Sequence, residues 1–265
     1  MEKTEITPDE IRLRPSHQGR NVLVTGAVRG IGLAIAKAYV ERSATVGICD
    51  LSLDDVAATC AELNASGPGR AVPVACDVSD YASLEAAIAA TGLEFDTLIN
   101  NAGISPKHAG VAHKVWEMDP DEWRRVVDVN LTGSFNAIRA LTPAMVQAKR
   151  GWIVNTSSVA GKTYTPIVAC HYAATKSSII GFTKHLAAEL GPYAIRVNAV
   201  APGRIATPMV AGVAPEVNAE QVRLTPMARL GEPAEVADVV VWLTSTESSF
   251  VTGQTVDVAG GFLLT

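Results

Sequence analysis

The sequence predicts an α/β protein built on one doubly wound parallel sheet of seven strands, with helices on both faces. Short runs rich in Val and Ile alternate with longer segments of helical period, which is the pattern of repeated strand–helix–strand units. Aromatic residues make up only 5% of the chain while 48% is hydrophobic, and this composition favours helices packed on a sheet through small side chains. Crossovers between parallel strands are almost always right-handed, so the helices should cover both faces.

The elements follow from the alternation of these two periods. Strands are expected at Asn21–Thr25, Thr45–Cys49, Ala71–Ala75, Thr97–Asn100, Gly151–Asn155, Ile195–Val200 and Thr255–Val258. Helices are expected at Ile31–Glu41, Leu53–Asn64, Tyr81–Ala90, Pro120–Ala148, Tyr172–Leu190 and Pro233–Thr244. The stretch Thr207–Arg229 has several prolines and glycines and few alternating apolar residues, so it is either a lid over a substrate site or an ordinary surface excursion.

The chain divides into a polar N-terminal tail, residues 1–20, and a single domain over residues 21–265, since no repeat or linker interrupts it. The first residues are charged and no apolar run approaches 18 residues, which predicts neither a signal peptide nor a membrane span. The four cysteines show no metal or redox spacing, so reduced thiols and a cytoplasmic location are expected. A net charge of −5 argues against a nucleic-acid partner.

A glycine-rich turn joins the first strand to the first helix in the segment TGAVRGIG, which contains Gly26, Arg29, Gly30, Ile31 and Gly32. Glycines let the backbone approach a pyrophosphate closely, and the N–H groups at the start of the helix favour an anion. The strand before the turn and the helix after it make this a candidate dinucleotide site.

Asp50 follows the second strand at the distance where dinucleotide-binding proteins carry an acid for the ribose hydroxyls. It could instead cap the next helix, but Ser52 and Asp55 already form a capping box there. Ribose binding is therefore the favoured role, and it predicts NAD rather than NADP, because a 2′-phosphate would be repelled by the carboxylate. Arg29 argues the other way, since it could pair with such a phosphate.

Five segments in order, TGAVRGIG, CDV at Cys76–Val78, NNAG at Asn100–Gly103, YAATK at Tyr172–Lys176 and the C-terminal TGQTVDVAGG, resemble the short-chain dehydrogenase/reductase family. The resemblance runs from about Asn21 to Gly261. It implies a Rossmann-type fold and hydride transfer between a nicotinamide cofactor and a small alcohol or carbonyl compound. It also implies a homo-oligomer, expected to be a tetramer, in which the apolar terminal run Phe262–Leu264 would be covered.

The resemblance implies four catalytic residues. Tyr172 is the general acid in reduction and the general base in oxidation, and Lys176 binds the nicotinamide ribose. Ser158 holds the substrate oxygen, and its neighbour Ser157 is the less favoured candidate for this role. Asn130 holds a water molecule of the proton relay. Tyr172 and Lys176 lie one helical turn apart. Bringing a phenol from a pKa near 10 to neutrality takes about 4 kcal/mol. An ion pair at about 4 Å with an effective dielectric of about 20 supplies that amount, so Lys176 is expected to lower the Tyr172 pKa.

The family pattern also places residues along the cofactor. Asp77 and Val78 should border the adenine, and Asn101, Ala102 and Gly103 should line the cleft. The segment that meets the carboxamide should contain Pro202, Gly203, Ile205 and Thr207. No metal site is expected, because the five histidines lack metal-ligand spacing. His171, beside Tyr172, is expected to lie at the edge of the pocket.

The substrate stays open at this level, because the candidate pocket residues suit polyols, hydroxy acids or hydroxyacyl groups. One alternative is an NADPH-dependent 3-oxoacyl-carrier reductase, whose basic rim would include Lys149 but lacks a second basic residue where Tyr193 stands. Another is a non-catalytic NAD(H) sensor, which retention of Tyr172, Lys176 and Ser158 disfavours.

Overall fold

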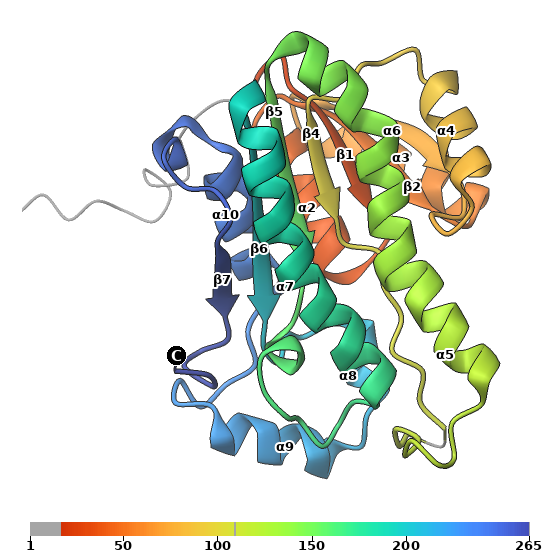
Figure 1. The fold of residues 1–265 in the computed structure, drawn as a ribbon, viewed down its shortest axis with the longest axis vertical. Coiled ribbons are helices and arrows are strands. Elements are labelled where there is room, and N and C mark those ends of the chain that lie inside the picture. The colour runs from red at the N-terminus through yellow and green to blue at the C-terminus, as the bar shows by residue number, and fades with distance from the viewer. Residues whose placement is uncertain (1–16, 109, 265) are drawn as a thin grey trace, which may run out of the picture.

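The computed structural model describes residues 17–108 and 110–264. Seven strands form one parallel sheet in the order β3-β2-β1-β4-β5-β6-β7, so the predicted fold class is confirmed (Figure 1). The strands are β1 (Asn21–Thr25), β2 (Thr45–Asp50), β3 (Arg70–Ala75), β4 (Thr97–Asn100), β5 (Gly151–Thr156), β6 (Ile195–Pro202) and β7 (Thr255–Val258). β1 is flanked by β2 and β4, so the chain reverses its direction of travel across the sheet between β3 and β4. Ligands of open parallel sheets bind at the carboxyl side of such a switch point.

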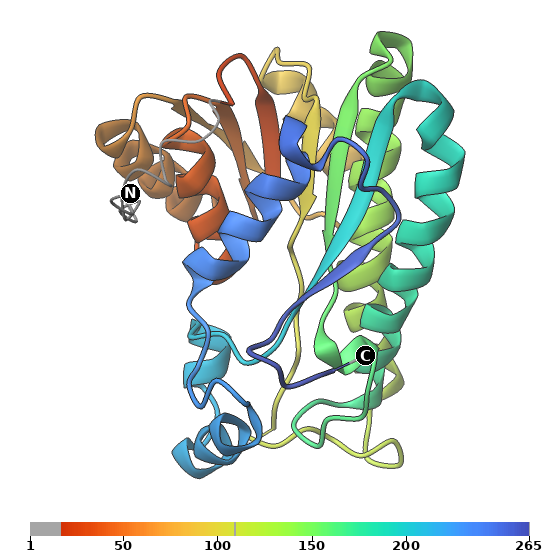
Figure 2. The same cartoon turned by 90° about the vertical axis from the view of Figure 1, so that its left-hand side faces the viewer.

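Helices cover both faces of the sheet (Figure 2). One face carries α2 (Gly30–Val40), α3 (Leu53–Ser66) and α10 (Pro233–Thr244), and the other carries α4 (Tyr81–Ala90), α6 (Gly133–Ala148) and α7 (Cys170–Leu190). Each face has its own apolar core, one around Ile35, Tyr39 and Val240 and the other around Leu84, Leu98 and Ile153. A sheet buried on both sides accounts for strands that are almost continuously apolar.

The long helix expected at Pro120–Ala148 is interrupted. The structure has α5 (Pro120–Val127), then a π-helical turn η1 (Asp128–Thr132), then α6. The Gly133 N–H bonds to the Asp128 carbonyl, one residue further back than in an α-helix. Turns of this kind often mark functional sites, and this one contains Asn130.

The segment expected to be irregular, Thr207–Arg229, contains two helices, α8 (Pro208–Ala211) and α9 (Pro215–Leu224). Both begin with a proline, which is compatible with the first turn of a helix because its missing N–H would be unpaired there. Together they lie beyond the carboxyl ends of the strands, below β6 and β7 in Figure 1. Three short 3-10 turns complete the described elements, at Val159–Gly161 (η2), Gly191–Tyr193 (η3) and Thr246–Ser248 (η4).

The last residues of the expected N-terminal tail, from His17 to Arg20, pack against the domain. His17 is only 2% exposed and its ring meets that of Tyr39 edge-on at 5.2 Å. The Arg20 guanidinium lies 3.3 Å from the centroid of the Trp152 ring and donates a hydrogen bond to the Thr244 carbonyl. Residues 1–16 lie outside the described part of the chain. None of the helices in residues 17–264 that the structure describes is long and apolar enough to cross a membrane.

Candidate active site

The glycine-rich turn lies between β1 and α2, at the carboxyl edge of the sheet. Gly26 has φ +65°, and a Cβ at this position would lie 2.9 Å from the Ala102 Cα. A Cβ at Gly32 would lie 2.0 Å from the Gly26 carbonyl oxygen. Real Cβ atoms do not approach other atoms this closely, so both positions require glycine. The turn therefore brings the backbone of β1, α2 and the segment after β4 into contact.

Two side chains hold this turn in place. The Asn101 side-chain amide donates to the carbonyls of Thr25 and Gly26, both at 3.0 Å. The Thr25 hydroxyl oxygen accepts from the N–H groups of Asn101 and Ala102, also at 3.0 Å. The NNAG segment thus acts here through hydrogen bonds that fix the glycine turn against the segment after β4.

The start of α2 fits an anionic group. Its N-cap residue, Arg29, is extended and exposed and its side chain makes no capping hydrogen bond, and the first turn contains no acidic residue. The first N–H groups of a helix have no partner within the helix and carry a partial positive charge. Because Gly30 and Ile31 begin this helix directly after the turn, their backbone could hold the pyrophosphate of a dinucleotide.

Asp50 is the last residue of β2, next to this turn. Its carboxylate accepts from the Leu51 N–H at 2.9 Å and from the Val28 N–H at 3.4 Å. The Ser52 hydroxyl caps α3 by accepting from the Asp55 N–H at 3.2 Å. The capping position is therefore occupied by Ser52, and the Asp50 carboxylate lies at the turn where a ribose would be read.

The other expected adenine neighbours follow β3. The Asp77 carboxylate accepts from both the N–H and the hydroxyl of Ser79, at 2.9 and 2.7 Å. Val78 is buried against Gly133, where a Cβ would lie 2.7 Å from its side chain. These contacts fix the loop after β3 beside the π-helical turn.

Tyr172 and Lys176 lie one turn apart near the start of α7. The Lys176 Nζ is 5.6 Å from the centroid of the Tyr172 ring and donates to the Thr156 carbonyl at 2.8 Å. The Tyr172 hydroxyl makes a hydrogen bond with Ser158. The Ser158 oxygen also accepts from the Ala160 N–H at 3.2 Å, so it caps the 3-10 turn η2. The three predicted residues therefore meet at the end of β5.

Ser157 and Ser158 have different environments. The Ser157 hydroxyl donates to the Lys176 carbonyl at 2.7 Å and is almost fully buried. That bond ties the residue after β5 to α7 and uses the Ser157 hydroxyl as a structural donor. Of the two serines, Ser158 is the one whose hydroxyl lies at the phenol.

Asn130 is buried in the π-helical turn. Its side-chain oxygen accepts from the Ile104 N–H at 2.8 Å, and its amide donates to the Ile104 carbonyl at 3.0 Å and to the Thr175 hydroxyl at 3.2 Å. A Cβ at Gly103 would lie 3.3 Å from the Asn130 oxygen and 3.5 Å from the Lys176 Nζ. The absence of a side chain at Gly103 thus lets Asn130 and Lys176 approach each other.

The pKa values differ from the sequence-based expectation. Burial raises the pKa of Tyr172, and the hydrogen bond from Ser158 only partly opposes it. Burial also lowers the pKa of Lys176 to about 8. In the protein without cofactor, desolvation of both groups outweighs the attraction between ammonium and phenolate. The expectation from the charge separation took account of the attraction but not of desolvation. The expectation that Lys176 lowers the Tyr172 pKa is therefore wrong for the protein without cofactor.

The segment after β6 lies next to the glycine turn. The Gly203 N–H donates to the Val258 carbonyl at 3.0 Å, and a Cβ at Gly203 would lie 2.9 Å from Ala259. Ile205 is buried, and the Thr207 methyl lies 3.4 Å from the position a Cβ would take at Gly30. Pro202 ends β6. These contacts place the Pro202–Thr207 segment between the glycine turn and the C-terminal residues.

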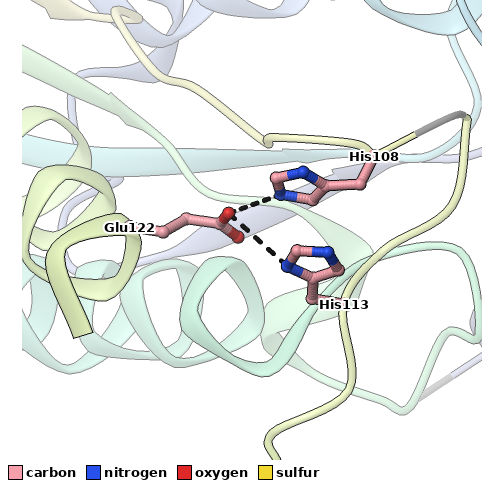
Figure 3. Close-up of side chains that lie close together, drawn as sticks. All are labelled: His108, His113 and Glu122. Atoms are coloured by element: carbon pink, nitrogen blue, oxygen red, sulfur yellow. Dashed lines mark hydrogen bonds and ion pairs between the residues drawn. The ribbon is translucent and has the colours of Figure 1, made fainter. Parts of the chain in front are cut away.

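Three histidines gather around Glu122 of α5, a cluster that the sequence did not reveal. Figure 3 shows two of them, His108 and His113, beside the Glu122 carboxylate. The His171 Nε2 lies 2.9 Å from one carboxylate oxygen, and the Nε2 of His108 and the Nδ1 of His113 lie 2.5 and 3.7 Å from the other. The rings of His108 and His113 stack at 3.4 Å. Possible ligand atoms of His108, His113 and Glu122 all lie within 4.8 Å of one another, an arrangement that chain spacing did not show.

His171 is fully buried, so the expectation that it lies at the pocket edge is wrong. Burial pushes the pKa of Glu122 upward, but hydrogen bonds from His171 and His108 and the charge of these rings outweigh it, so the pKa is lowered overall. The Glu122 carboxylate thereby joins the loop after β4 to α5 and to the residue preceding Tyr172.

The comparisons with known proteins identify the family of the chain. A family model described as enoyl-(acyl carrier protein) reductase matches residues 26–263. A trans-4-hydroxycyclohexanecarboxylate dehydrogenase from Sinomonas cyclohexanicum is 41% identical over 247 residues, which are 90% of this chain and 91% of that protein. A crystal structure described as a 3-oxoacyl-[acyl-carrier protein] reductase from Brucella melitensis has 83% identity and a TM-score of 0.95, covering 100% of this chain and 99% of its own. A second Brucella melitensis structure of that description, with bound NAD, has 80% identity and a TM-score of 0.94, with the same coverage.

The doubly wound sheet, the glycine turn at the start of α2 and the residues gathered at the end of β5 define a nicotinamide-dependent oxidoreductase. The chain belongs to the short-chain dehydrogenase/reductase family, as the sequence motifs indicated.

Proposed function

We propose that this enzyme transfers a hydride between NAD(H) and a secondary alcohol or ketone of a small organic substrate, with Tyr172 as the general acid and base. The observation that carries the proposal is the convergence of Tyr172, Ser158 and Lys176 at the end of β5, beside the glycine turn.

In this mechanism the bound nicotinamide supplies the hydride acceptor for oxidation and the donor for reduction. During oxidation the phenolate form of Tyr172 would accept the proton of the substrate hydroxyl while the same carbon gives its hydride to the nicotinamide, so the alcohol becomes a carbonyl. Ser158, which is hydrogen-bonded to Tyr172, orients the substrate oxygen. The Lys176 ammonium binds the nicotinamide ribose and assists the phenol, and Asn130 continues the proton path beside Gly103.

NAD is favoured over NADP by the position of Asp50. Its carboxylate lies at the end of β2 with its oxygens directed at the turn residues Val28 and Leu51. A 2′-phosphate carries about 1.5 to 2 negative charges and would be repelled there. Arg29 is exposed and could pair with such a phosphate, but its side chain has no contact that holds it toward Asp50. The relative of known structure with bound NAD agrees with this choice.

Reduction of 3-oxoacyl groups on a carrier protein is the second candidate, because the two Brucella melitensis structures are described as reductases of that class. A carrier protein is acidic, so a basic rim at the cleft is expected. Lys149 ends α6 in the left-handed conformation, whereas Tyr193 occupies the second position where a basic residue would be needed. We rank free alcohols and ketones above carrier-bound groups for this reason.

The experiment that separates these functions is a panel of free alcohols and ketones and one 3-oxoacyl-carrier substrate, each assayed with NAD(H) and NADP(H) by absorbance of the reduced nicotinamide. The proposal expects turnover of free substrates with NAD(H). Higher kcat/KM for the carrier substrate with NADPH would assign the second function instead.

We also infer that the enzyme is a cytoplasmic homotetramer with one catalytic domain over residues 21–265. The terminal run supports assembly, because Leu264 is 84% exposed and Phe262 and Leu263 are only partly buried. Such apolar side chains at the end of a chain favour cover by a second subunit.

A further inference from the structure

Two half-buried cations, Lys107 and Arg204, lie in loops at the carboxyl edge of the sheet, and within the described residues neither forms an ion pair. Lys107 belongs to the loop after β4, and Arg204 follows β6. Lys107 donates one hydrogen bond, to the Ile167 carbonyl. Arg204 donates from Nε at 3.0 Å and from a terminal nitrogen at 2.5 Å to the side-chain oxygen of Asn218. Both partners are neutral, so neither positive charge is balanced.

The neighbouring carboxylates at this edge of the sheet are already paired. Asp257 lies 2.7 Å from the Lys162 ammonium, and Glu235 lies 2.6 Å from the Arg229 guanidinium. Among the described residues, no acidic side chain forms an ion pair with Lys107 or Arg204. Within residues 17–108 and 110–264, these two cations therefore lack a counter-charge, which a bound anion would supply.

The pKa values of the two side chains reflect the energetic cost of this arrangement. Burial lowers the pKa of Lys107, and repulsion from Arg204 lowers it further. Burial also lowers the pKa of Arg204. The repulsion acts on the lysine because a guanidinium holds its proton throughout the accessible pH range. Two partly desolvated like charges are unfavourable without a counter-charge. An anion bound to both would offset the cost of burial and the repulsion between the two cations.

The donors left over suit a carboxylate. An ammonium has three N–H donors, of which Lys107 uses one, and a guanidinium has five, of which Arg204 uses two on Asn218. Asn218 lies in α9 and is itself held by hydrogen bonds to the carbonyls of Val210 and Val213. The guanidinium fork is therefore oriented before any ligand arrives, which is how arginine recognises carboxylates.

Both cations are connected to segments that adjoin the candidate site. Ile167, the partner of Lys107, lies in the segment between η2 and α7, a few residues before Tyr172. Arg204 lies in the Pro202–Thr207 segment, which borders the glycine turn through Thr207. From this arrangement we propose that Lys107 and Arg204 form an anion subsite that binds a carboxylate group on the substrate. The proposal rests on the proposed function, and it narrows the substrates to hydroxy acids and oxo acids.

The test compares acids with matched neutral esters in the NAD-loaded enzyme. Titration calorimetry with cyclohexanecarboxylate, which carries no hydroxyl to oxidise, measures anion binding without turnover, and its methyl ester is the neutral probe. Steady-state kinetics with 3-hydroxybutyrate and 4-hydroxycyclohexanecarboxylate, and with their methyl esters, measure the same preference in catalysis. The wild type should bind the acid and not the ester.

The substitutions Lys107→Met and Arg204→Gln remove one charge each. Losing a hydrogen bond to a charged group should weaken acid binding and raise KM for the hydroxy acids about tenfold to a hundredfold, while values for the esters change by less than about twofold. The control variants are Lys114→Met, an exposed lysine of the same loop, and Arg223→Gln, an exposed arginine of α9 paired with Glu220. Thermal unfolding and the NADH dissociation constant show whether each variant retains its fold and cofactor site.

Three results would decide against the anion subsite. Equal binding of acid and ester by the wild type would show that the protein does not recognise the negative charge of the acid. Unchanged acid binding in both variants would show that Lys107 and Arg204 do not form the subsite. Weakened NADH binding with unchanged acid binding assigns the cations to the cofactor phosphates. If no alcohol is oxidised with either cofactor, the proposed function fails, but the calorimetric comparison still decides whether the anion subsite exists.

Discussion

The Lys176 Nζ lies 5.6 Å from the centroid of the Tyr172 ring. Its hydrogen bond to the Thr156 carbonyl holds the ammonium beside the end of β5, one helical turn from the phenol. Both groups are desolvated, so each favours its neutral form, and burial sets the Lys176 pKa at about 8. The lysine therefore changes charge within the range where such enzymes are assayed.

This shift predicts a pH dependence of stability. The folded-state pKa of Lys176, about 8, lies below its unfolded value of 10.5, so the unfolded state binds more protons between these values and stability rises with pH. The free energy of unfolding should increase by about 1 kcal/mol more in the wild type than in Lys176→Met between pH 8 and pH 9. Urea unfolding at both pH values measures this difference. Parallel changes in the two proteins would show that Lys176 is not desolvated as described.

Asp50 is expected to set the cofactor preference. Asp50→Ala removes the ribose acceptor and the repulsion of a 2′-phosphate, so kcat/KM should fall for NAD and rise for NADP. Arg29 then becomes free to pair with the phosphate, and the double variant Asp50→Ala with Arg29→Ala should lose the gain for NADP. Asp55→Ala, an exposed acid in the following helix, is the control. A wild-type enzyme that prefers NADP would contradict the assignment.

Glu122 should stabilise the fold through the buried His171. Glu122→Ala leaves the imidazole without its carboxylate partner at 2.9 Å, which should cost about 1 to 3 kcal/mol. The matched control is Glu189→Ala on α7, whose contact with the exposed His185 is 3.9 Å. Thermal unfolding measures both variants. Equal, small changes in melting temperature would show that the histidine cluster has no structural role.

The oligomeric state is expected to be a tetramer. The substitution Leu264→Asp replaces an exposed apolar side chain near the terminus by a charged one. It should weaken assembly without changing the cofactor site. Light scattering coupled to gel filtration at micromolar concentration measures the mass of both proteins. A monomeric wild type would contradict this prediction.

The sheet and the phosphate turn could be predicted because their signals are local. Gly26, Gly30 and Gly32 follow an apolar strand and begin a helix, and every one of the seven strands was found in its place. The π-helical turn at Asp128–Thr132 could not, because a shift of one residue barely changes the period of a helix that continues on both sides. The helix α9 has few apolar residues, and its starting proline suggested a loop instead.

The residues of the site divide in the same way. Tyr172, Lys176 and Ser158 belong to recognisable segments, and the structure brings them together at the end of β5. The cluster around Glu122 joins a loop, α5 and α7, so its members have no common spacing in the chain. The pKa values of Tyr172 and Lys176 depend on burial, which charge spacing along a helix does not express.

Substitution of Tyr172 by Phe tests the central claim most directly, because it removes the proton-transferring hydroxyl and keeps the ring. The rate of NADH formation from the best alcohol of the panel should fall by a factor of about 10² to 10⁴, since that is what removal of a general acid or base costs. The NADH dissociation constant should stay within about twofold of the wild-type value, because the glycine turn and Asp50 do not contact the phenol. A Tyr172→Phe enzyme that kept most of its wild-type turnover would contradict the account.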